Sequence, residues 1–140
     1  MDTRPHGAQD SQRIDVVYVW VDESDPAWQA RRQRACEYGS SSHGGELACG
    51  DMLAKRRDQE ALRFSLRALQ TFFPGHGRVH IVTDGQRPAW LRTGNGLSIV
   101  DHRELIPAES LPVFDPGHVE SYIHRIEGLS ERFFYLLSFP

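Results

Sequence analysis

Residues 14–21 read IDVVYVWV, and this stretch decides the fold of the chain. Nearly every residue in it is β-branched or aromatic, which is typical of a β-strand. The apolar residues run on without the alternation of a half-exposed strand, so we predict a central strand that is covered on both faces. The strand is expected to end at the acidic turn over residues 22–26.

Two helices are predicted after this strand. Asp25 is well placed to cap a helix that has Pro26 in its first turn, which predicts a helix over residues 27–37. From Asp58 onward, apolar residues recur at the 3.6-residue period of a helix, at Leu62, Leu66, Leu69 and Phe73. The pair Pro74-Gly75 is expected to stop this second helix.

Three further strands are predicted over residues 79–83, 97–100 and 133–137, because each run is apolar. Residues 105–117 contain three prolines and little periodicity, so we expect an extended connection there. A helix from about His118 to Glu127 should follow, with Gly128 just after its C-cap. Strands that alternate with helices predict an α/β fold with a layered, mostly parallel sheet.

Length and composition narrow the classes of function. The chain has 140 residues, which allows one domain, expected over residues 14–140. Its net charge of −3 and the lack of any block of like charge speak against a nucleic-acid partner. The polar N-terminus lacks the apolar segment of a secretory signal, and no apolar run approaches the ~20 residues of a membrane span. We therefore predict a cytoplasmic location.

Two segments are expected to stand outside the packed domain. Residues 1–13 offer few apolar side chains to offset the entropy of ordering, so they predict a disordered tail. Residues 38–56 are rich in Gly and Ser and predict a flexible loop. Cys36 and Cys49 lie on either side of the Gly/Ser-rich stretch and lack the close partners of a zinc site, so we interpret them as ordinary thiols.

Carboxylates follow the predicted strands at Asp22, Asp84 and Asp101. Ligands of open α/β sheets gather at the carboxyl ends of the strands, and hard cations there take oxygen ligands that they share with phosphates. The pattern therefore suits Mg²⁺ or Mn²⁺ holding a diphosphate. The alternative is that each Asp only caps a turn.

Other polar residues are candidates for the same site. Trp20 beside Asp22 suits stacking of a base, although an aromatic residue in a buried strand is often core. Arg63 and Arg67, four residues apart on one helix, either share an anion or form a solvated face. Glu120 and His124 are also four apart, so a carboxylate there would orient an imidazole as a base, unless the pair is simply exposed.

Four ordered stretches resemble one known family. They are IDVVYVWVDESDP at residues 14–26, RRDQEALRFSLRAL at 56–69, VHIVTDGQRPAWL at 79–91 and LPVFDPGHVESYIHRIEGLSERFFYL at 111–136. Together they resemble the Stealth family of bacterial capsular and cell-wall polysaccharide phosphotransferases, which includes the animal N-acetylglucosamine-1-phosphotransferase of lysosomal enzyme tagging. Its first conserved region would span residues 14–37 and its second residues 57–140.

The resemblance implies an activity and a set of site residues. It implies a sheet like that of nucleotide-sugar transferases of the GT-A type, and transfer of a sugar 1-phosphate from a nucleotide sugar, with a UDP-sugar as the expected donor, to a hydroxyl of a glycan acceptor. Mg²⁺ or Mn²⁺ is the expected cofactor. The implied donor-binding residues are Trp20, Val21, Asp22, Arg63, Ser65, Thr83, Asp84 and Gly85. The implied catalytic residues are His118, Glu120, His124 and Arg125.

The chain also departs from the family pattern. The family's last strand leads into an Asn-Asp-Asp sequence that supplies metal-binding carboxylates, whereas Leu136 is followed here by LSFP, so the metal ligands are unknown. We therefore expect a partial, inactive transferase domain. Two alternatives stay open: a non-catalytic module that binds nucleotide sugars or regulates a homologue, and a glycosyltransferase that would cleave the sugar–oxygen bond. The sequence leaves the oligomeric state unknown.

Overall fold

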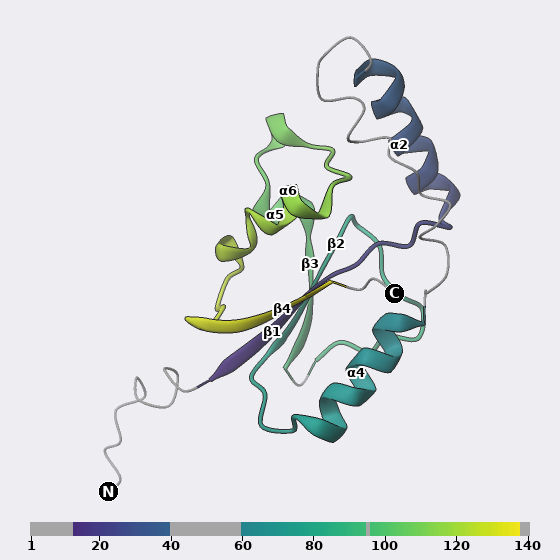
Figure 1. The fold of residues 1–140 in the computed structure, drawn as a ribbon. Helices are drawn as coiled ribbons and strands as arrows, with labels where there is room; N and C mark the ends of the chain where they lie inside the picture. The colour runs from purple at the N-terminus through teal and green to yellow at the C-terminus, as the bar shows by residue number, and fades with distance from the viewer. Residues whose placement is uncertain (1–12, 40–59, 95, 138–140) are drawn as a thin grey trace, which may run out of the picture.

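Four parallel β-strands form the framework of the protein (Figure 1). The structure, a computed structural model, describes residues 13–39, 60–94 and 96–137. The strands are β1 (Ile14–Val19), β2 (Val79–Thr83), β3 (Leu97–Asp101) and β4 (Arg132–Leu137), in the order β3-β2-β1-β4. The α/β prediction is thus confirmed, and β1 is central, paired with β2 on one side and β4 on the other.

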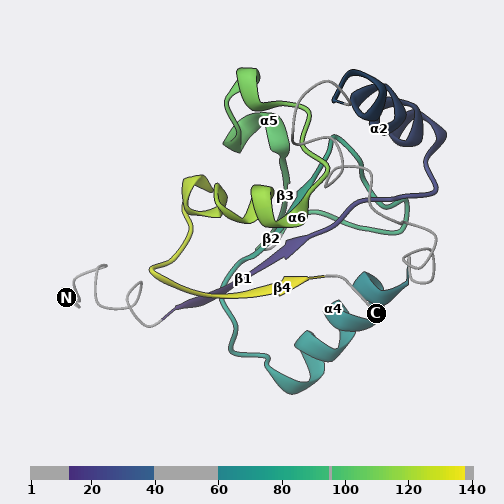
Figure 2. The same cartoon turned by 45° about the horizontal axis from the view of Figure 1, so that its top comes forward.

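Helices cover both faces of the sheet (Figures 1 and 2). Helix α4 (Ala61–Phe72) lies on one face. The short helices α5 (His102–Leu105) and α6 (Pro116–Glu120) lie on the other face, together with the 3₁₀ turns η2 (Ala108–Ser110) and η3 (Ile123–Arg125). Helix α2 (Pro26–Gly39) stands beyond the carboxyl end of β1.

The alternation of β1 divides the core into two clusters. Residues 16, 18 and 20 face α4, and residues 17 and 19 face α5 and α6. The α4 cluster contains Val16, Tyr18, Trp20, Leu62, Val79, Ile81 and Leu91. The opposite cluster contains Val17, Val19, Val82, Leu105, Ile106, Val113, Val119, Ile123 and Ile126. This two-sided burial explains why residues 16–19 of β1 are apolar without alternation.

A buried carboxylate ties the strands together at their amino ends. Asp15 is fully buried and its Oδ1 accepts hydrogen bonds from Arg13 Nε (2.9 Å) and the backbone N–H of Arg78 (2.8 Å). Its Oδ2 accepts from His80 Nε2 (3.1 Å) and the backbone N–H of Ser130 (3.1 Å). One side chain therefore links β1 to the loops that lead into β2 and β4.

Most predicted elements are confirmed, with shifts of a few residues at their ends. The prediction of a helix from His118 to Glu127 is wrong: α6 begins at Pro116 with Asp115 as its N-cap and ends at Glu120. After Glu120 the backbone bonds join residues three apart, as in Arg125 N–H to Tyr122 O, so the chain tightens into η3.

The connection predicted as extended over residues 105–117 contains the 3₁₀ turn η2 and the start of α6, and it follows directly on α5, which ends at Leu105. Helix α5 carries a capping box in which the Asp101 side chain accepts from the N–H of Arg103 and Glu104 bonds back to the N–H of Asp101. The Asp-x-x-Glu spacing of residues 101–104 was a usable signal for this helix.

Several predictions concern residues outside the described ranges. These are the tail, apart from Arg13, most of the loop over residues 38–56, and the start of the second helix at Asp58. Cys36, on α2, is disulfide-bonded, so the interpretation of an ordinary thiol at that position is wrong. Cys49 lies outside the described residues.

Candidate functional site

The parallel sheet brings the predicted carboxylates to one edge. Asp22 and Asp84 follow β1 and β2, which are neighbours, and Asp101 ends β3, the next strand. All three side chains are partly exposed. The carboxyl edge of the sheet, with α2 above it, is therefore the candidate ligand site.

Gln86 joins the loops after β1 and β2. Its Oε1 accepts from the backbone N–H of Asp22 (2.7 Å), and its Nε2 donates to Asp22 O (2.9 Å) and to Asp25 Oδ2 (3.1 Å). Thr83 Oγ1 in turn donates to the backbone O of Gln86 (2.8 Å). The sequence analysis missed Gln86, although it belongs to the quoted stretch 79–91. It fixes the spacing of the two loops.

Asp22 and Asp84 are each engaged within the protein. Asp22 Oδ1 accepts from the N–H (2.9 Å) and Oγ (2.6 Å) of Ser24, which forms a turn of the kind that the alternative interpretation described. Asp84 Oδ2 lies 3.3 Å from Arg31 Nη2 of helix α2. The Asp84–Arg31 pair holds α2 over the end of β2.

His102 is a second residue that the sequence analysis missed. Its side chain is 2% exposed, and its Nδ1 lies 4.0 Å from Asp84 Oδ1, beyond hydrogen-bonding distance. Neither ring nitrogen has a hydrogen-bond partner among the residues that the structure describes. Burial lowers the pKa of His102 more than the charges of Asp84 and Asp101 raise it, so the imidazole is neutral at pH 7. A buried, neutral histidine thus lies next to the carboxylates.

The third carboxylate, Asp101, caps α5 and binds Arg103. Arg103 Nη2 lies 2.8 Å from Asp101 Oδ2, and these hydrogen bonds hold the pKa of Asp101 below its usual range despite partial burial. Among the described residues, no group of three or more His, Cys, Asp or Glu side chains is arranged to hold a metal ion. The expected Mg²⁺ or Mn²⁺ therefore stays a prediction based on the resemblance.

The other predicted donor-binding residues divide between core and edge. Trp20 is 6% exposed and packs in the α4 cluster, as the core alternative for this residue has it. Val21 is partly exposed just after β1. Thr83 is fully buried at the end of β2, and Gly85 has a φ of +68°, a conformation that glycine adopts without strain.

Arg63 and Ser65 belong to α4, on the face of the sheet opposite α6. Because α4 connects two parallel strands, it begins near their carboxyl ends and runs back, which places Arg63 in the first turn close to the edge. Ser65 Oγ is 2.8 Å from Tyr18 Oη. Ser65 therefore has an intramolecular partner in the core.

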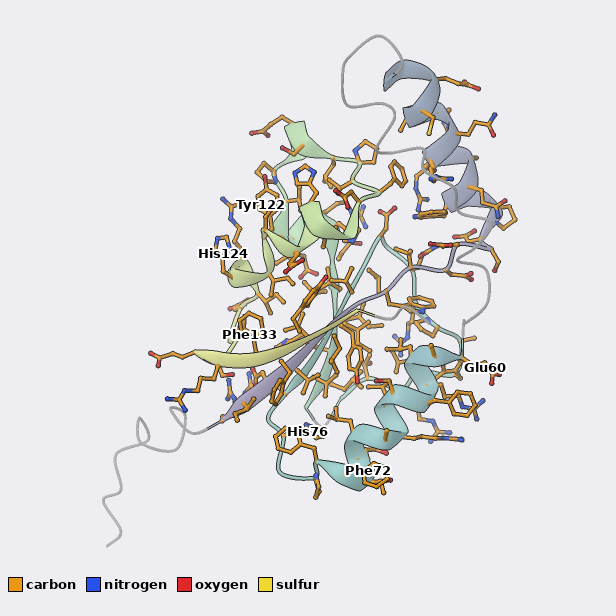
Figure 3. The ribbon with its side chains drawn as sticks, viewed as in Figure 1. Glu60, Phe72, His76, Tyr122, His124 and Phe133 are labelled. Atoms are coloured by element: carbon orange, nitrogen blue, oxygen red, sulfur yellow. The ribbon has the colours of Figure 1, made fainter. Side chains whose placement is uncertain are left out.

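The predicted catalytic residues lie on α6 and η3. His118 and Glu120 are exposed on α6, and Arg125 donates from Nη1 to the backbone O of Leu105 (3.2 Å). His124 is exposed and points outward from η3, on the side of the short helices remote from α2 (Figure 3). Since α6 ends at Glu120, the predicted pairing of Glu120 with His124 along one continuous helix is wrong.

Tyr122 replaces that pair with a different arrangement. Its ring lies 5.7 Å from the ring of His118, centroid to centroid, and the guanidinium of Arg125 lies 5.3 Å from its centroid. The sequence analysis did not single out Tyr122. The face of Tyr122 attracts the Arg125 cation, and its contact with His118 connects η3 to α6.

Comparison with known proteins settles the family. Conserved region 1 of the Stealth proteins matches residues 12–36, and conserved region 2 matches residues 55–137, more than half of the chain. The chain belongs to the Stealth family. The two Stealth regions meet at the carboxyl edge of the sheet, where region 1 provides Asp22, Asp25 and Arg31 and region 2 provides Asp84 and Gln86.

Curated Stealth-like relatives share this part of the sequence. Two exopolysaccharide phosphotransferases of Streptomyces coelicolor are 48% and 42% identical over 126 residues, which cover 88% of this chain and 20% and 13% of theirs. A capsular polysaccharide phosphotransferase of Neisseria meningitidis is 37% identical over 125 residues, which cover 88% of this chain and 33% of that protein. The Stealth chain thus spans a third or less of the length of these relatives.

One more residue distinguishes the Stealth site. Tyr135 of β4 has a hydroxyl oxygen that is buried and lacks a hydrogen-bond partner in the described part of the chain. Burial, followed by the negative charges of Glu120 and Asp115, raises the pKa of Tyr135 to about 12. The hydroxyl therefore keeps its proton at neutral pH.

No helix in the described ranges is long and apolar enough to cross a membrane.

Proposed function

We propose that this chain forms the N-terminal part of the catalytic domain of a Stealth sugar-phosphate transferase. The reaction would move a sugar 1-phosphate from a nucleotide sugar, with a UDP-sugar as the expected donor, to a hydroxyl of a polysaccharide. One observation carries the proposal: the two Stealth regions meet at the carboxyl edge of the parallel sheet, with Gln86 joining their loops. The names of the relatives, exopolysaccharide and capsular polysaccharide phosphotransferases, support it.

The chemistry requires a nucleophile, a base and stabilisation of phosphate charge. The acceptor hydroxyl would attack the phosphorus that bears the sugar, a new P–O bond would form, and the bond to the nucleoside monophosphate would break. The hydroxyl proton would pass to a base, for which Glu120 and His118 on α6 are the candidates. Arg125 and Arg31 are the candidates for pairing with phosphate oxygens.

The donor would lie along the carboxyl edge. Asp22 and Asp84 suit hydroxyl groups of a ribose or sugar, because ionised carboxylates only accept hydrogen bonds. Any Mg²⁺ or Mn²⁺ would supply positive charge at the diphosphate. The described residues do not form a site for such an ion, so we assign no step to it. We place the reaction in the cytoplasm as part of this proposal.

A second candidate function is a non-catalytic module that binds nucleotide sugars or regulates a longer homologue. The observation that favours it is the place of His124, a predicted catalytic residue that points outward on the side of the short helices remote from α2 (Figure 3). In that case the edge residues would bind donor without turning it over. The two functions share the donor site and differ in whether transfer follows.

Calorimetry and a transfer assay test both functions. The 140-residue chain should bind UDP-N-acetylglucosamine or another UDP-sugar, and Asp84→Asn should weaken that binding. Thr71→Ala, near the far end of α4, is the control and should change nothing. Phosphorus NMR would then show a phosphodiester and a nucleoside monophosphate if transfer occurs. Binding without turnover would support the module, and no binding would refute both proposals. Release of a nucleoside diphosphate would indicate glycosyl transfer.

A further inference from the structure

Two tyrosines on neighbouring strands differ in one respect. Tyr18 of β1 and Tyr135 of β4 both place their rings against the core. The hydroxyl of Tyr18 has a partner, Ser65 Oγ at 2.8 Å, whereas the hydroxyl of Tyr135 is buried and has none. Buried polar atoms in folded proteins are nearly always hydrogen-bonded, so the exception at Tyr135 calls for a physical reason.

The position of Tyr135 in the sheet shows which face its side chain lies on. Tyr135 pairs with Val17 of β1, and its ring packs against the cluster under α5 and α6. The next residue back, Phe134, points to the opposite face and contacts Phe73 at the end of α4, with ring centroids 5.9 Å apart. Tyr135 is therefore turned toward α6, the helix that carries the candidate base Glu120.

Two carboxylates act on the Tyr135 hydroxyl. Glu120, the last residue of α6, and Asp115, its N-cap, are close enough for their negative charges to raise the pKa of Tyr135 beyond the effect of burial. Tyr135 therefore retains its proton at neutral pH and can donate a hydrogen bond. The structure thus places a donor without a partner near two groups that accept.

The charges around Tyr135 select the kind of ligand. A phosphate oxygen would be repelled by Glu120 and Asp115, because like charges disfavour one another most strongly where water is excluded. A sugar hydroxyl meets no such repulsion, since it can accept from the Tyr135 O–H and donate its own hydrogen to a carboxylate. This combination of donor and acceptors fits a carbohydrate hydroxyl.

We propose that Tyr135 binds a carbohydrate hydroxyl, its O–H donating to the sugar oxygen while the sugar hydrogen is directed to the Glu120 carboxylate. The inference rests on the proposed function, because it assigns a sugar subsite beside α6, the helix that carries the candidate base Glu120. The sugar belongs either to the donor or to the acceptor glycan. Both sources present the same hydroxyl chemistry, so the experiment must separate them.

The first measurement separates folding from binding. Tyr135→Phe removes only the hydroxyl, and because that hydroxyl lacks a partner in the free protein, the urea midpoint of unfolding should stay the same or rise. Tyr18→Phe is the matched control, since it removes a hydroxyl that does have a partner, and its midpoint should fall. A large loss of stability in Tyr135→Phe would overturn the inference, because the hydroxyl would then serve the fold.

The second measurement compares three probes by calorimetry: UMP, UDP-N-acetylglucosamine and chitotriose. If Tyr135 binds the sugar of the donor, Tyr135→Phe should weaken the binding of UDP-N-acetylglucosamine by roughly three- to tenfold and leave the binding of UMP unchanged. If Tyr135 binds the acceptor, only the binding of chitotriose should weaken by that factor. Equal affinities of wild type and Tyr135→Phe for all three probes, or no binding of either sugar-bearing probe, would overturn the inference.

The probes also keep this inference distinct from the proposed function. The wild type could bind neither UMP nor UDP-N-acetylglucosamine and yet bind chitotriose more tightly than Tyr135→Phe does. That result would refute the donor function and support the sugar subsite. The wild type could instead bind UMP and UDP-N-acetylglucosamine with equal affinity and not bind chitotriose. That result would support the nucleotide site and refute the role of Tyr135.

Discussion

His80 Nε2 donates a hydrogen bond to Asp15 Oδ2 across 3.1 Å, and both side chains are almost completely removed from solvent. Each belongs to a different strand, β1 or β2, at the amino end of the sheet. Because Asp15 also accepts from the backbone N–H groups of Arg78 and Ser130, its carboxylate organises three segments at once. This arrangement stabilises the edge of the sheet opposite to the candidate site.

Asp15→Asn should destabilise the fold without altering the ligand edge. The asparagine keeps one acceptor oxygen and turns an NH₂ group toward donors, so at least two hydrogen bonds are lost in a buried place. We expect the free energy of unfolding to fall by about 2–4 kcal/mol, measured by urea denaturation. An unchanged unfolding midpoint would contradict the role of Asp15, and Thr71→Ala provides an exposed control.

Acid should remove the same contribution. Burial alone would raise the pKa of Asp15, but hydrogen bonds from His80, Ser130 and Arg78 and the charge of Arg13 together hold it below 3.8. The stabilisation is therefore complete above pH 3.8 and is lost as the pH falls through the lower pKa of the folded state. The stability difference between wild type and Asp15→Asn should shrink as the pH falls below about 3.8. A difference that is constant from pH 7 to pH 2.5 would disprove this linkage.

Ser65→Ala should reveal whether Ser65 serves the fold. Its Oγ is 2.8 Å from the hydroxyl of Tyr18, whose side chain is 1% exposed. Removal of this partner leaves the Tyr18 hydroxyl unsatisfied, so we expect a loss of about 1–2 kcal/mol in thermal or urea unfolding. Arg63→Ala, on the same helix, is the comparison for ligand binding. Weaker UDP-sugar binding in Ser65→Ala at unchanged stability would reverse this assignment.

Gln86→Ala should loosen the candidate donor site more than the fold. The substitution removes two hydrogen bonds to the backbone of Asp22 and one to the Asp25 carboxylate. We expect a loss of about 1–2 kcal/mol in stability, together with weaker UDP-sugar binding by calorimetry. The Gln86 hydrogen bond is also the largest influence that lowers the pKa of Asp25. An NMR titration should therefore find a higher Asp25 pKa in the variant. An unchanged pKa would contradict the role given to the Gln86 hydrogen bonds.

Phe134→Lys should reduce self-association of the chain. In the described part of the structure β4 pairs only with β1, and Phe134 is 53% exposed on this edge strand. Exposed apolar edges promote pairing between molecules, and lysine opposes it. Sedimentation at several concentrations should show less association for Phe134→Lys than for Phe64→Lys, which changes an equally exposed residue on α4. Equal association of the two variants would argue against pairing through β4.

The strands were predictable because their sequences satisfy one simple requirement. Residues 79–83, VHIVT, are mostly β-branched and are buried on both faces, and the predicted and observed bounds of β2 coincide. The central place of β1 followed from the same pattern. The segment after β3 was harder, because α5 is only four residues long and is stabilised by its capping box more than by an apolar stripe.

The sequence predicted that Asp22 and Asp84 lie at one edge of the sheet, but not the contacts that they make there. Parallel strands necessarily bring Asp22 and Asp84 to one edge. Sequence spacing does not reveal that Gln86 bonds to Asp22, or that Tyr122 contacts both His118 and Arg125. It also does not reveal the missing partner of the Tyr135 hydroxyl. Such contacts depend on how loops from distant segments pack against each other.

The order of the strands has a further consequence for how such a domain can vary. Because β4 is the last strand of the described sheet, a strand added beside it would use backbone groups that β1 and β2 do not need. The register of the existing strands and the Asp15 anchor would remain as they are. Further strands can therefore be added beside β4 while the geometry of the carboxyl edge is conserved.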